Sequence, residues 1–339
     1  MKVLITGGAG FVGSQLGKHL YRNGHEVVLL DNMRFGHPDN LLIDGKPFGT
    51  FLHKDIRSED LAACCASIDT VFHLAGIAAL PVCQTDPREA YDVNVAGVGN
   101  VLEASRRSGV RRIIFSSTSA VYEGAKADRL REDHPIAPDL VYSCTKAAAE
   151  TACQSFAKNY GMDIVIARFF NVYGPHQDVT RISPPFTSYV ARELVMERPP
   201  VLFNASDAER DYVHSDDVVT LLTLMMEAPG RFGADRFNVC SGHGHSVPAL
   251  YNLFLRASGK NIAAAYANPQ SYWDKYPVLF EGNNPLSRTR ITEEVFKSAV
   301  GDPSTTRQRF GWSATTEIGA GIASVYVDAQ RRLRAANPA

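Results

Sequence analysis

Two side chains four residues apart, at the start of a predicted helix, have the chemistry for proton transfer. The segment Tyr142-Ser-Cys-Thr-Lys146 places a phenol and an ammonium on one face of that helix, because residues i and i+4 are neighbours there. A nearby ammonium stabilises a phenolate and lowers the pKa of the phenol toward neutrality. Tyr142 is therefore predicted to act as a proton-transferring base.

A second segment has the same spacing, Tyr122-Glu-Gly-Ala-Lys126. Gly124 follows a predicted strand in this segment, so we expect a loop without fixed i,i+4 geometry. Spacing alone does not separate the two copies, but the helical setting favours Tyr142 and Lys146.

Three hydroxyl residues, Ser116-Ser117-Thr118, come directly after an apolar run. In a parallel sheet, side chains just beyond a strand's carboxyl end face the ligand crevice. One of these hydroxyls could bond the reacting oxygen beside Tyr142. The alternative is ordinary turn capping by serine and threonine.

Glycines interrupt the first apolar run at Gly7, Gly10 and Gly13, and an amphipathic helix pattern follows. Such a turn lets the backbone approach a pyrophosphate, while N–H groups at the helix start point at the phosphates. Phe11 and Val12 lie within this turn. The spacing G-x-x-G-x-x-G differs from the G-x-G-x-x-G of the commonest dehydrogenases.

An acid, Asp31, ends the second apolar run about 20 residues after the glycines, where a carboxylate accepts hydrogen bonds from the adenosine ribose. A carboxylate there repels a 2′-phosphate, which favours NAD over NADP, although Arg34 lies close by. The alternative is that Asp31 is an ordinary turn residue at the end of a strand.

Apolar runs and helical stretches alternate along the chain, which predicts an α/β protein with a doubly wound parallel sheet. Several of the runs are nearly continuous, as strands buried on both faces should be. The predicted strands are 2–7, 26–31, 50–56, 70–76, 111–117, 163–171 and 236–241, and the predicted helices are 11–23, 86–108, 143–160 and 215–228.

The alternation changes after Gly174-Pro175, which predicts a smaller, discontinuous C-terminal lobe that binds the substrate. We expect residues 1–174 to form the cofactor domain, with 211–245 returning to it. Residues 175–210 and 246–330 would form the lobe, and 331–339 a frayed tail.

Composition excludes several classes of protein. Hydrophobic residues make up 45% of the chain, charged residues 21%, and the net charge is -1, so no nucleic-acid surface is indicated. No apolar run is long enough for a membrane span, and because a predicted strand begins at once we expect no secretory signal. The six cysteines lack C-x-x-C spacing, so we expect neither a zinc site nor a disulfide framework. Free cysteines are typical of proteins in a reducing cytoplasm. His243 and His245 lack partner ligands, so no metal is expected.

The motifs in their order resemble one family, the extended short-chain dehydrogenase/reductases, and within it the nucleotide-sugar epimerase/dehydratase branch. This resemblance covers residues 1 to about 312 and implies a Rossmann-type fold. It is carried by Thr6-Gly-Gly-Ala-Gly-Phe-Val-Gly13, Asp31-Asn32, Asp55-Ile56, His73-Leu-Ala-Gly76, Asn94-Val, Tyr142-Ser-Cys-Thr-Lys146, Arg168-Phe-Phe-Asn-Val-Tyr-Gly-Pro175, Glu209-Arg-Asp-Tyr-Val-His214 and Arg309-Phe-Gly-Trp312.

The resemblance implies a role for each matching residue and a homodimer formed by the helices at 86–108 and 143–160. Tyr142 would take a proton from a sugar hydroxyl with Thr118 assisting, while Lys146 would also bond the nicotinamide ribose. NAD would contact Gly7, Gly10, Phe11, Val12, Gly13, Asp31, Asn32, Asp55, Ile56, Leu74, Ala75, Gly76, Asn94, Ser116, Tyr142 and Lys146. The nucleotide-diphosphate sugar would contact Thr118, Tyr142, Asn171, Arg210 and Arg290, with Arg288 as the alternative to Arg290.

The residues after Thr118 divide this branch by reaction. Sugar 4,6-dehydratases resemble Thr-Asp-Glu-Val-Tyr and sugar-acid decarboxylases Thr-Ser-Glu-Val-Tyr, whereas this chain has Thr118-Ser-Ala-Val-Tyr122. Without those acids, hydride and proton transfer remain, which predicts a 4-epimerase working through a 4-keto sugar. A dehydratase or reductase of the same family is the alternative. A non-catalytic NAD-binding regulator is disfavoured because such proteins tend to lose the tyrosine or the lysine.

Two residues depart from the family pattern. Glu123 stands where glycine usually follows Val-Tyr, and it is either a shifted loop residue or a carboxylate of the sugar pocket that would support elimination. Cys83 occupies a loop where a sugar-facing serine is common. The sugar specificity is therefore expected to differ from that of the commonest glucose/galactose enzymes.

Overall fold

The computed structural model describes residues 1–125 and 127–336, and it divides into two units. The first unit comprises Met1–Phe170, Val218–Val239 and Asp302–Ser313. The second comprises Asn171–Asp217, Cys240–Gly301 and the described residues from Ala314 onward. Lys126 of the second Tyr-x-x-x-Lys segment and residues 337–339 of the predicted tail lie outside the described residues.

The first unit is built on a seven-stranded sheet in which every neighbouring pair is parallel, as the alternation of apolar runs predicted. The strand order is β12-β8-β7-β6-β1-β2-β5, so the chain reverses direction across the sheet at β1, between β2 and β6. Ligands of such sheets bind outside the carboxyl ends of the strands at this reversal. The strands are β1 (Lys2–Thr6), β2 (Glu26–Asp31), β5 (Thr50–His53), β6 (Thr70–His73), β7 (Arg112–Thr118), β8 (Ile164–Phe169) and β12 (Gly233–Val239).

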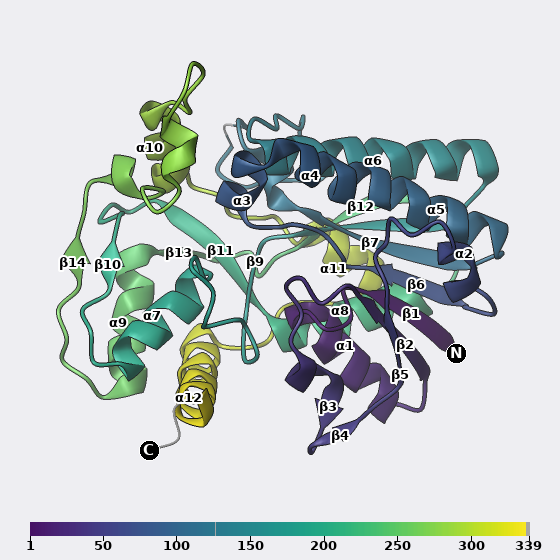
Figure 1. Ribbon diagram of the computed structural model, residues 1–339, viewed down its shortest axis with the longest axis horizontal. Helices are drawn as coiled ribbons and strands as arrows, with labels where there is room; N and C mark the ends of the chain where they lie inside the picture. Colours follow the sequence, from purple (N-terminus) through teal and green to yellow (C-terminus); the bar gives the residue numbers. More distant parts are fainter. Residues whose placement is uncertain (126, 337–339) are drawn as a thin grey trace. The chain divides into compact units, whose positions relative to one another are not determined.

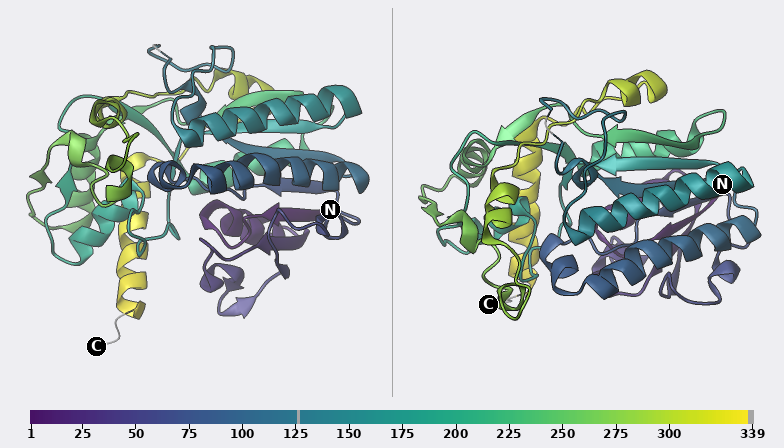
Figure 2. Two further views of the ribbon diagram at one scale, coloured as in Figure 1. Left: turned by 45° about the horizontal axis from the view of Figure 1, so that its top comes forward. Right: turned by 90° about the horizontal axis from the view of Figure 1, so that it is seen from above.

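Helices cover this sheet, and Figures 1 and 2 show α5 and α6 running side by side across one of its faces. Leu4, Val71 and Ile113 of the strands are buried on that side with Val98 of α5 and Ala149 of α6. Burial of both faces explains why the strands read as continuous apolar runs. The helices are α1 (Phe11–Arg22), α2 (Leu61–Cys64), α3 (Leu80–Thr85), α4 (Pro87–Tyr91), α5 (Gly97–Arg107), α6 (Val141–Tyr160), most of α8 (Ser215–Glu227) and α11 (Ser304–Phe310).

The helix predicted at 86–108 has an irregular centre. α4 and α5 are joined by a π-helical turn, Asp92–Ala96, rather than by regular α-helix. Asp86 accepts a hydrogen bond from the Glu89 N–H and caps α4, in line with the start signal Asp86-Pro87. Single π-helical turns occur frequently at functional sites, and this one contains Asn94.

The second unit combines a small mixed sheet with helices (Figure 1). β11 (Glu209–His214) lies between parallel β9 (Asn171–Tyr173) and antiparallel β13 (Gly244–Ser246). The segment predicted to rejoin the main sheet at residue 211 does so only from Val218, because β11 pairs with β9 instead. The remaining elements are β10 (Val201–Leu202), β14 (Ala265–Tyr266), α7 (Phe186–Val195), α9 (Val247–Ser258), α10 (Arg288–Phe296) and α12 (Ile318–Ala336).

The predicted frayed tail is helical over most of its length, because α12 continues to Ala336. Asp328 is buried and accepts hydrogen bonds from the His176 N–H at 2.7 Å and from Arg331 at 2.7 Å. The same carboxylate pairs with Arg332 at 3.0 Å. These i,i+3 and i,i+4 pairs support the last turns of the helix, which explains why the prediction was wrong.

Candidate active site

The glycine turn after β1 has no room for side chains. A Cβ on Gly13 would lie 2.2 Å from the Gly7 oxygen, and one on Gly7, whose φ is +73°, would lie 2.8 Å from the Ala75 nitrogen. No side chain among the described residues caps the start of α1. The first-turn N–H groups of Phe11 and Val12 therefore face an open approach that suits an anion such as a pyrophosphate.

Asp31 lies at the carboxyl end of β2 and turns its carboxylate toward this glycine turn. Its Oδ2 accepts a hydrogen bond from the Ala9 N–H at 3.0 Å, and its Oδ1 accepts one from the Met33 N–H at 2.8 Å. Burial raises the pKa of Asp31, and the two backbone hydrogen bonds oppose that rise. The carboxylate thus shapes the turn, and its remaining lone pairs are those a ribose hydroxyl would need.

A polar chain follows β2 and β5 beside Asp31. The Asn32 amide donates to Asp55 at 2.8 Å, and Arg57 holds the pKa of Asp55 well below its usual range. Arg34 pairs with Glu89 of α4. Arg34, which could otherwise bind the 2′-phosphate of NADP, therefore already has an anionic partner. This agrees with the preference for NAD expected from Asp31.

Ile56 is buried rather than open to a ligand. A Cβ added at Gly97 of α5 would lie 2.6 Å from the Ile56 side chain, so the two residues are in close contact. The Ile56 oxygen accepts a hydrogen bond from Asn100 at 2.7 Å.

The loop Leu74-Ala75-Gly76 after β6 is fixed on two sides. The Leu74 and Ala75 N–H groups donate to Thr6, at 3.1 Å and 3.3 Å. Gly76 is closely covered, since a Cβ there would lie 3.0 Å from the Asn94 Oδ1.

Asn94 joins this loop to α6 from its π-helical turn. Its Oδ1 accepts from the Ile77 N–H at 2.9 Å, while its Nδ2 donates to the Ile77 oxygen at 3.0 Å and to the Thr145 hydroxyl at 3.1 Å. Both amide hydrogens are therefore used within the protein, and Asn94 positions the elements around it.

Thr118, Tyr142 and Lys146 come together at the carboxyl end of β7. The Lys146 Nζ donates to the Ser116 oxygen at 2.7 Å and lies 4.8 Å from the centre of the Phe115 ring. Thr118 and Tyr142 are hydrogen-bonded through their side chains. The Ser116 hydroxyl donates to the His73 oxygen at 3.0 Å and ties β7 to β6.

The pKa of Tyr142 does not follow the prediction. Burial raises the pKa of this phenol to about 12, and the hydrogen bond with Thr118 only partly opposes the rise. Lys146 is not among the groups that lower it, and its ammonium donates to the Ser116 oxygen. Burial also lowers the pKa of Lys146 to about 8.

The second tyrosine of the same spacing, Tyr122, has a structural role. It ends a 3₁₀ turn, Ser119–Tyr122, and Glu123–Ala125 after it are not helical, whereas Lys126 lies outside the described residues. Its hydroxyl accepts from Arg168 at 2.6 Å and donates to Asn238 at 3.0 Å.

A buried ion pair beside the site was missed by the sequence reasoning. Arg168 of β8 and Glu150 of α6 form two hydrogen bonds, at 2.7 Å and 2.9 Å, and Ser117 donates to the same carboxylate at 2.5 Å. Glu150 lies two turns after Tyr142 on α6 and therefore on the same face of the helix. A charged residue on that face was the signal in the sequence that could have revealed the ion pair.

The two residues that depart from the family pattern are both buried. Glu123 Oε2 accepts hydrogen bonds from the N–H groups of Asp139 and Leu140 and from the Ser143 hydroxyl. The Cys83 thiol donates to the Ile77 oxygen at 3.3 Å, and burial raises its pKa to about 12. Cys83 is therefore a neutral thiol at physiological pH.

In the second unit, Arg210 and Arg290 approach one carboxylate, that of Glu294. Arg290 Nη2 lies 3.5 Å from Glu294 Oε2, and Arg210 lies 3.9 Å from Oε1 while donating to the Glu294 backbone oxygen at 2.7 Å. Arg210 Nη1 is buried without a hydrogen-bond partner among the described residues. Arg288 instead pairs with Asp274.

Asn171 lies on β9, next to the strand that carries Arg210. Its side-chain Nδ2 donates to the Asp211 backbone oxygen at 2.8 Å. Asn171 is only partly buried, so its amide oxygen remains a candidate contact for a ligand.

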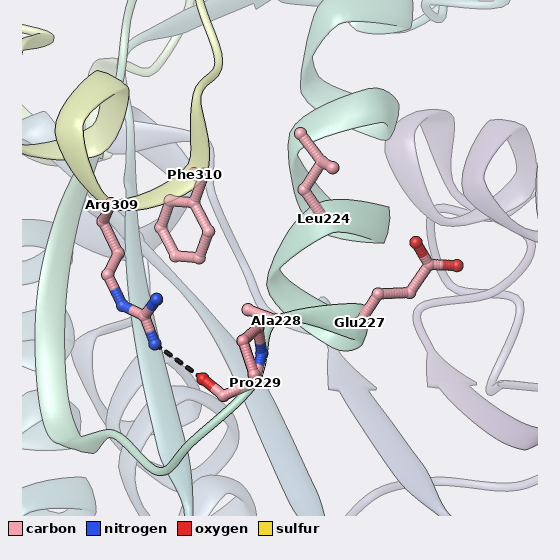
Figure 3. A pocket seen from close by; sticks show the side chains of 6 residues that line it. All are labelled: Leu224, Glu227, Ala228, Pro229, Arg309 and Phe310. Atoms are coloured by element: carbon pink, nitrogen blue, oxygen red, sulfur yellow. Dashed lines mark hydrogen bonds between the residues drawn. The ribbon is translucent and has the colours of Figure 1, made fainter.

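A hollow of about 240 Å³ lies in the first unit, between the end of α8 and α11 (Figure 3). The Arg309 guanidinium donates to the Pro229 oxygen at 2.8 Å across its rim. The hollow is lined by Leu224, Glu227, Ala228, Pro229, Arg309 and Phe310, so it contains no predicted site residue.

The described part of the chain has neither a candidate membrane span nor a metal-ligand cluster. None of the helices there combines the length and apolar character that a membrane crossing requires. Nor do three or more histidine, cysteine or acidic side chains gather there as metal ligands.

The fold and this site define a dinucleotide-binding protein with a tyrosine–lysine pair at the carboxyl edge of its sheet. A family described as the NAD dependent epimerase/dehydratase family matches residues 3–240, and the chain belongs to that family. UDP-glucose 4-epimerase of Mycolicibacterium smegmatis is 30% identical over 95% of this chain and 96% of its own length.

Solved structures that are similar to this chain also include UDP-glucose 4-epimerases. The Thermotoga maritima UDP-glucose 4-epimerase with UDP-glucose has a TM-score of 0.85 and 27% identity, covering 98% of this chain and 100% of the other. The Thermus thermophilus UDP-glucose 4-epimerase complex with NAD has a TM-score of 0.81 and 27% identity, covering 97% of this chain and 99% of the other.

Proposed function

We propose that this protein is an NAD-dependent nucleotide-sugar 4-epimerase that works through a 4-keto intermediate. The observation that carries this proposal is the meeting of Thr118, Tyr142 and Lys146 at the end of β7, in a chain whose next residues, Ser119 and Ala120, are not acids. A 4-epimerisation requires that C4 loses hydride while its hydroxyl loses a proton, and that both then return with the hydride on the opposite face of the 4-keto sugar.

Each of the three residues has one task in this proposal. Tyr142 exchanges a proton with the C4 hydroxyl, Thr118 holds the tyrosine and sugar oxygens by its hydroxyl, and Lys146 supplies a buried cation beside them. The chemistry that bound NAD supplies is reversible hydride acceptance, together with a positive charge that favours the phenolate.

The glycine turn and the residues around it fit NAD, because a side chain would fill the space that a pyrophosphate needs. We assign the cofactor site to the residues implied by the family resemblance. These are Gly7, Gly10, Phe11, Val12, Gly13, Asp31, Asn32, Asp55, Ile56, Leu74, Ala75, Gly76, Asn94, Ser116, Tyr142 and Lys146. Of these, Ile56 and Asn94 act through the loops that they hold.

We assign the diphosphate of the sugar nucleotide to Arg210 and Arg290, with Asn171 as a further contact. The buried, unpartnered Nη1 of Arg210 supports this assignment, because such a donor requires an acceptor. The names of the relatives point to a UDP-hexose, so UDP-glucose and UDP-galactose are the first substrates to test.

We further propose a cytoplasmic homodimer that packs through α4, α5 and α6. Tyr91 and Tyr160 on these helices are 46% and 58% exposed, which suits an interface rich in aromatic side chains. Six free cysteines agree with a reducing compartment. Sedimentation velocity of the purified protein tests the dimer, and a monomer would contradict it.

The function is tested by incubating purified protein with UDP-glucose and with UDP-galactose. Each is expected to yield its 4-epimer, while the near-ultraviolet absorbance of reduced NAD shows no net change. Loss of water from the sugar, or stoichiometric consumption of added reduced NAD, would instead indicate a dehydratase or a reductase.

A further inference from the structure

We propose that Glu123 is a positioning residue whose carboxylate fixes the start of α6, and so sets Tyr142 against Thr118, without transferring a proton itself. The proposal rests on the proposed function only where its test measures turnover.

The start of α6 lacks a cap of its own. The N-cap residue is Leu140, whose side chain cannot accept a hydrogen bond, and the structure has no capping bond from it. The first N–H groups of a helix need acceptors from elsewhere. This matters here because Tyr142 is the second residue of the helix.

Glu123 supplies an acceptor to the two residues that lead into this helix and to one side chain of its first turn. Its Oε2 receives the Asp139 and Leu140 N–H groups at 2.9 Å each and the Ser143 hydroxyl at 2.5 Å. The residue is only 9% exposed. A carboxylate at this end also interacts favourably with the helix dipole.

The backbone brings Glu123 to that place by folding the loop back on itself. The Ala137 N–H donates to the Val121 oxygen at 2.8 Å, and the Gly124 N–H donates to the Ala137 oxygen at 2.9 Å. The 3₁₀ turn that precedes Glu123 begins directly after Thr118. One carboxylate therefore joins the segment that carries Thr118 to the helical turn that carries Tyr142.

The same turn is held from its other side. Gln84 of α3 accepts the Val141 N–H through its Oε1 at 3.2 Å. Of the two contacts, only that of Glu123 comes from the segment of Thr118. Glu123 is thus the contact whose loss should change the distance between Thr118 and Tyr142.

The geometry does not suit Glu123 as an acid or base. A carboxylate that transfers protons to a sugar must reach it, whereas Oε2 already accepts three hydrogen bonds at the start of α6. To move toward a substrate, it would have to release the helix that positions Tyr142.

Three variants separate the two roles. Glu123→Gln keeps the side-chain length and an acceptor oxygen, so we expect kcat within about threefold of wild type and an unchanged KM. Glu123→Asp is one methylene shorter and should lose as much as Glu123→Ala, about tenfold or more in kcat. An inactive Gln variant beside a partly active Asp variant would overturn the proposal, because it would identify a proton-transferring carboxylate.

Amide hydrogen exchange of the ligand-free protein gives a readout that needs no substrate. Residues 139–143 should exchange faster in Glu123→Ala and Glu123→Asp, and at the wild-type rate in Glu123→Gln. Unchanged exchange in the Ala variant would overturn the proposal. Faster exchange in a protein whose wild type epimerises no sugar nucleotide would support the positioning role and count against the proposed function.

Asp302 offers a matched control in the same unit. Its carboxylate accepts the Ser304 N–H at 2.9 Å at the start of α11, a helix without site residues. Asp302→Ala should lower the unfolding temperature while leaving kcat unchanged. If both alanine variants lower stability and kcat in parallel, Glu123 contributes only to stability and the proposal fails.

Discussion

Lys146 donates a hydrogen bond to the backbone oxygen of Ser116 over 2.7 Å, which fixes its ammonium at the end of β7. The lysine is 5% exposed, and the Phe115 ring lies 4.8 Å from its Nζ. A cation in this setting loses hydration, so its pKa falls to about 8. The site therefore contains a charge that costs stability.

The first prediction concerns that charge. Burial lowers the pKa of Lys146 to about 8 from an ordinary 10.5, so between these values the unfolded chain binds more protons than the folded one. Stability contributed by Lys146 therefore rises with pH across this window. As the pH rises through this window, the free energy of unfolding of the wild type should increase relative to that of Lys146→Met by an amount on the order of 3 kcal/mol. Urea unfolding of both proteins below pH 8 and near pH 10.5 measures this, and a constant difference would contradict it.

The second prediction separates the two tyrosines. Tyr142→Phe should lower kcat by about 10²- to 10⁴-fold, because the proton carrier is removed, while bound NAD is retained. Tyr122→Phe removes hydrogen bonds with Arg168 and Asn238, so it should lower the unfolding temperature and keep the chemistry. Steady-state turnover, NAD content and thermal unfolding check both variants. Full turnover of the Tyr142 variant would refute its role.

The third prediction concerns the glycine turn. Gly13→Ala should abolish tight NAD binding, because its Cβ would lie 2.2 Å from the Gly7 oxygen, and should cost about 1–3 kcal/mol of stability. Gly233→Ala in β12 is the control, since a Cβ there meets no heavy atom within 4 Å. Calorimetric titration with NAD compares them. Equal NAD affinity in both variants would show that the turn does not hold the cofactor.

The fourth prediction distinguishes the arginines of the second unit. Arg210→Ala should raise the KM for a sugar nucleotide roughly tenfold to 100-fold, the value of a charge-assisted contact. Arg288→Ala should change it by about twofold or less, because Arg288 is an exposed partner of Asp274. NAD affinity serves as the control in both. A larger effect at Arg288 would reverse the assignment.

The sequence predicted features that depend on neighbours along the chain. β1 with its glycine turn, β2 ending in Asp31, and the helix bearing Tyr142 and Lys146 were all located from local patterns, and the structure has each of them. Periodicity and spacing act over one strand or a few helical turns, which is why these succeeded.

Features that depend on distant partners were not predictable. The burial of Tyr142 depends on segments distant in sequence, and this burial raises the pKa that local spacing predicted to fall. The acceptor of the Lys146 ammonium, Ser116, likewise lies 30 residues away. The hydrogen bonds of Glu123 at the start of α6 depend in the same way on how the intervening loop folds. The π-helical turn that contains Asn94 has no signature in apolar spacing.

The most direct test of the central claim uses UDP-glucose labelled with deuterium at C4. If hydride leaves and returns to that carbon, the UDP-galactose formed keeps the label at C4, and NMR detects it there in both epimers. Loss of the label to solvent, or a product lacking water, would contradict epimerisation by hydride transfer at C4.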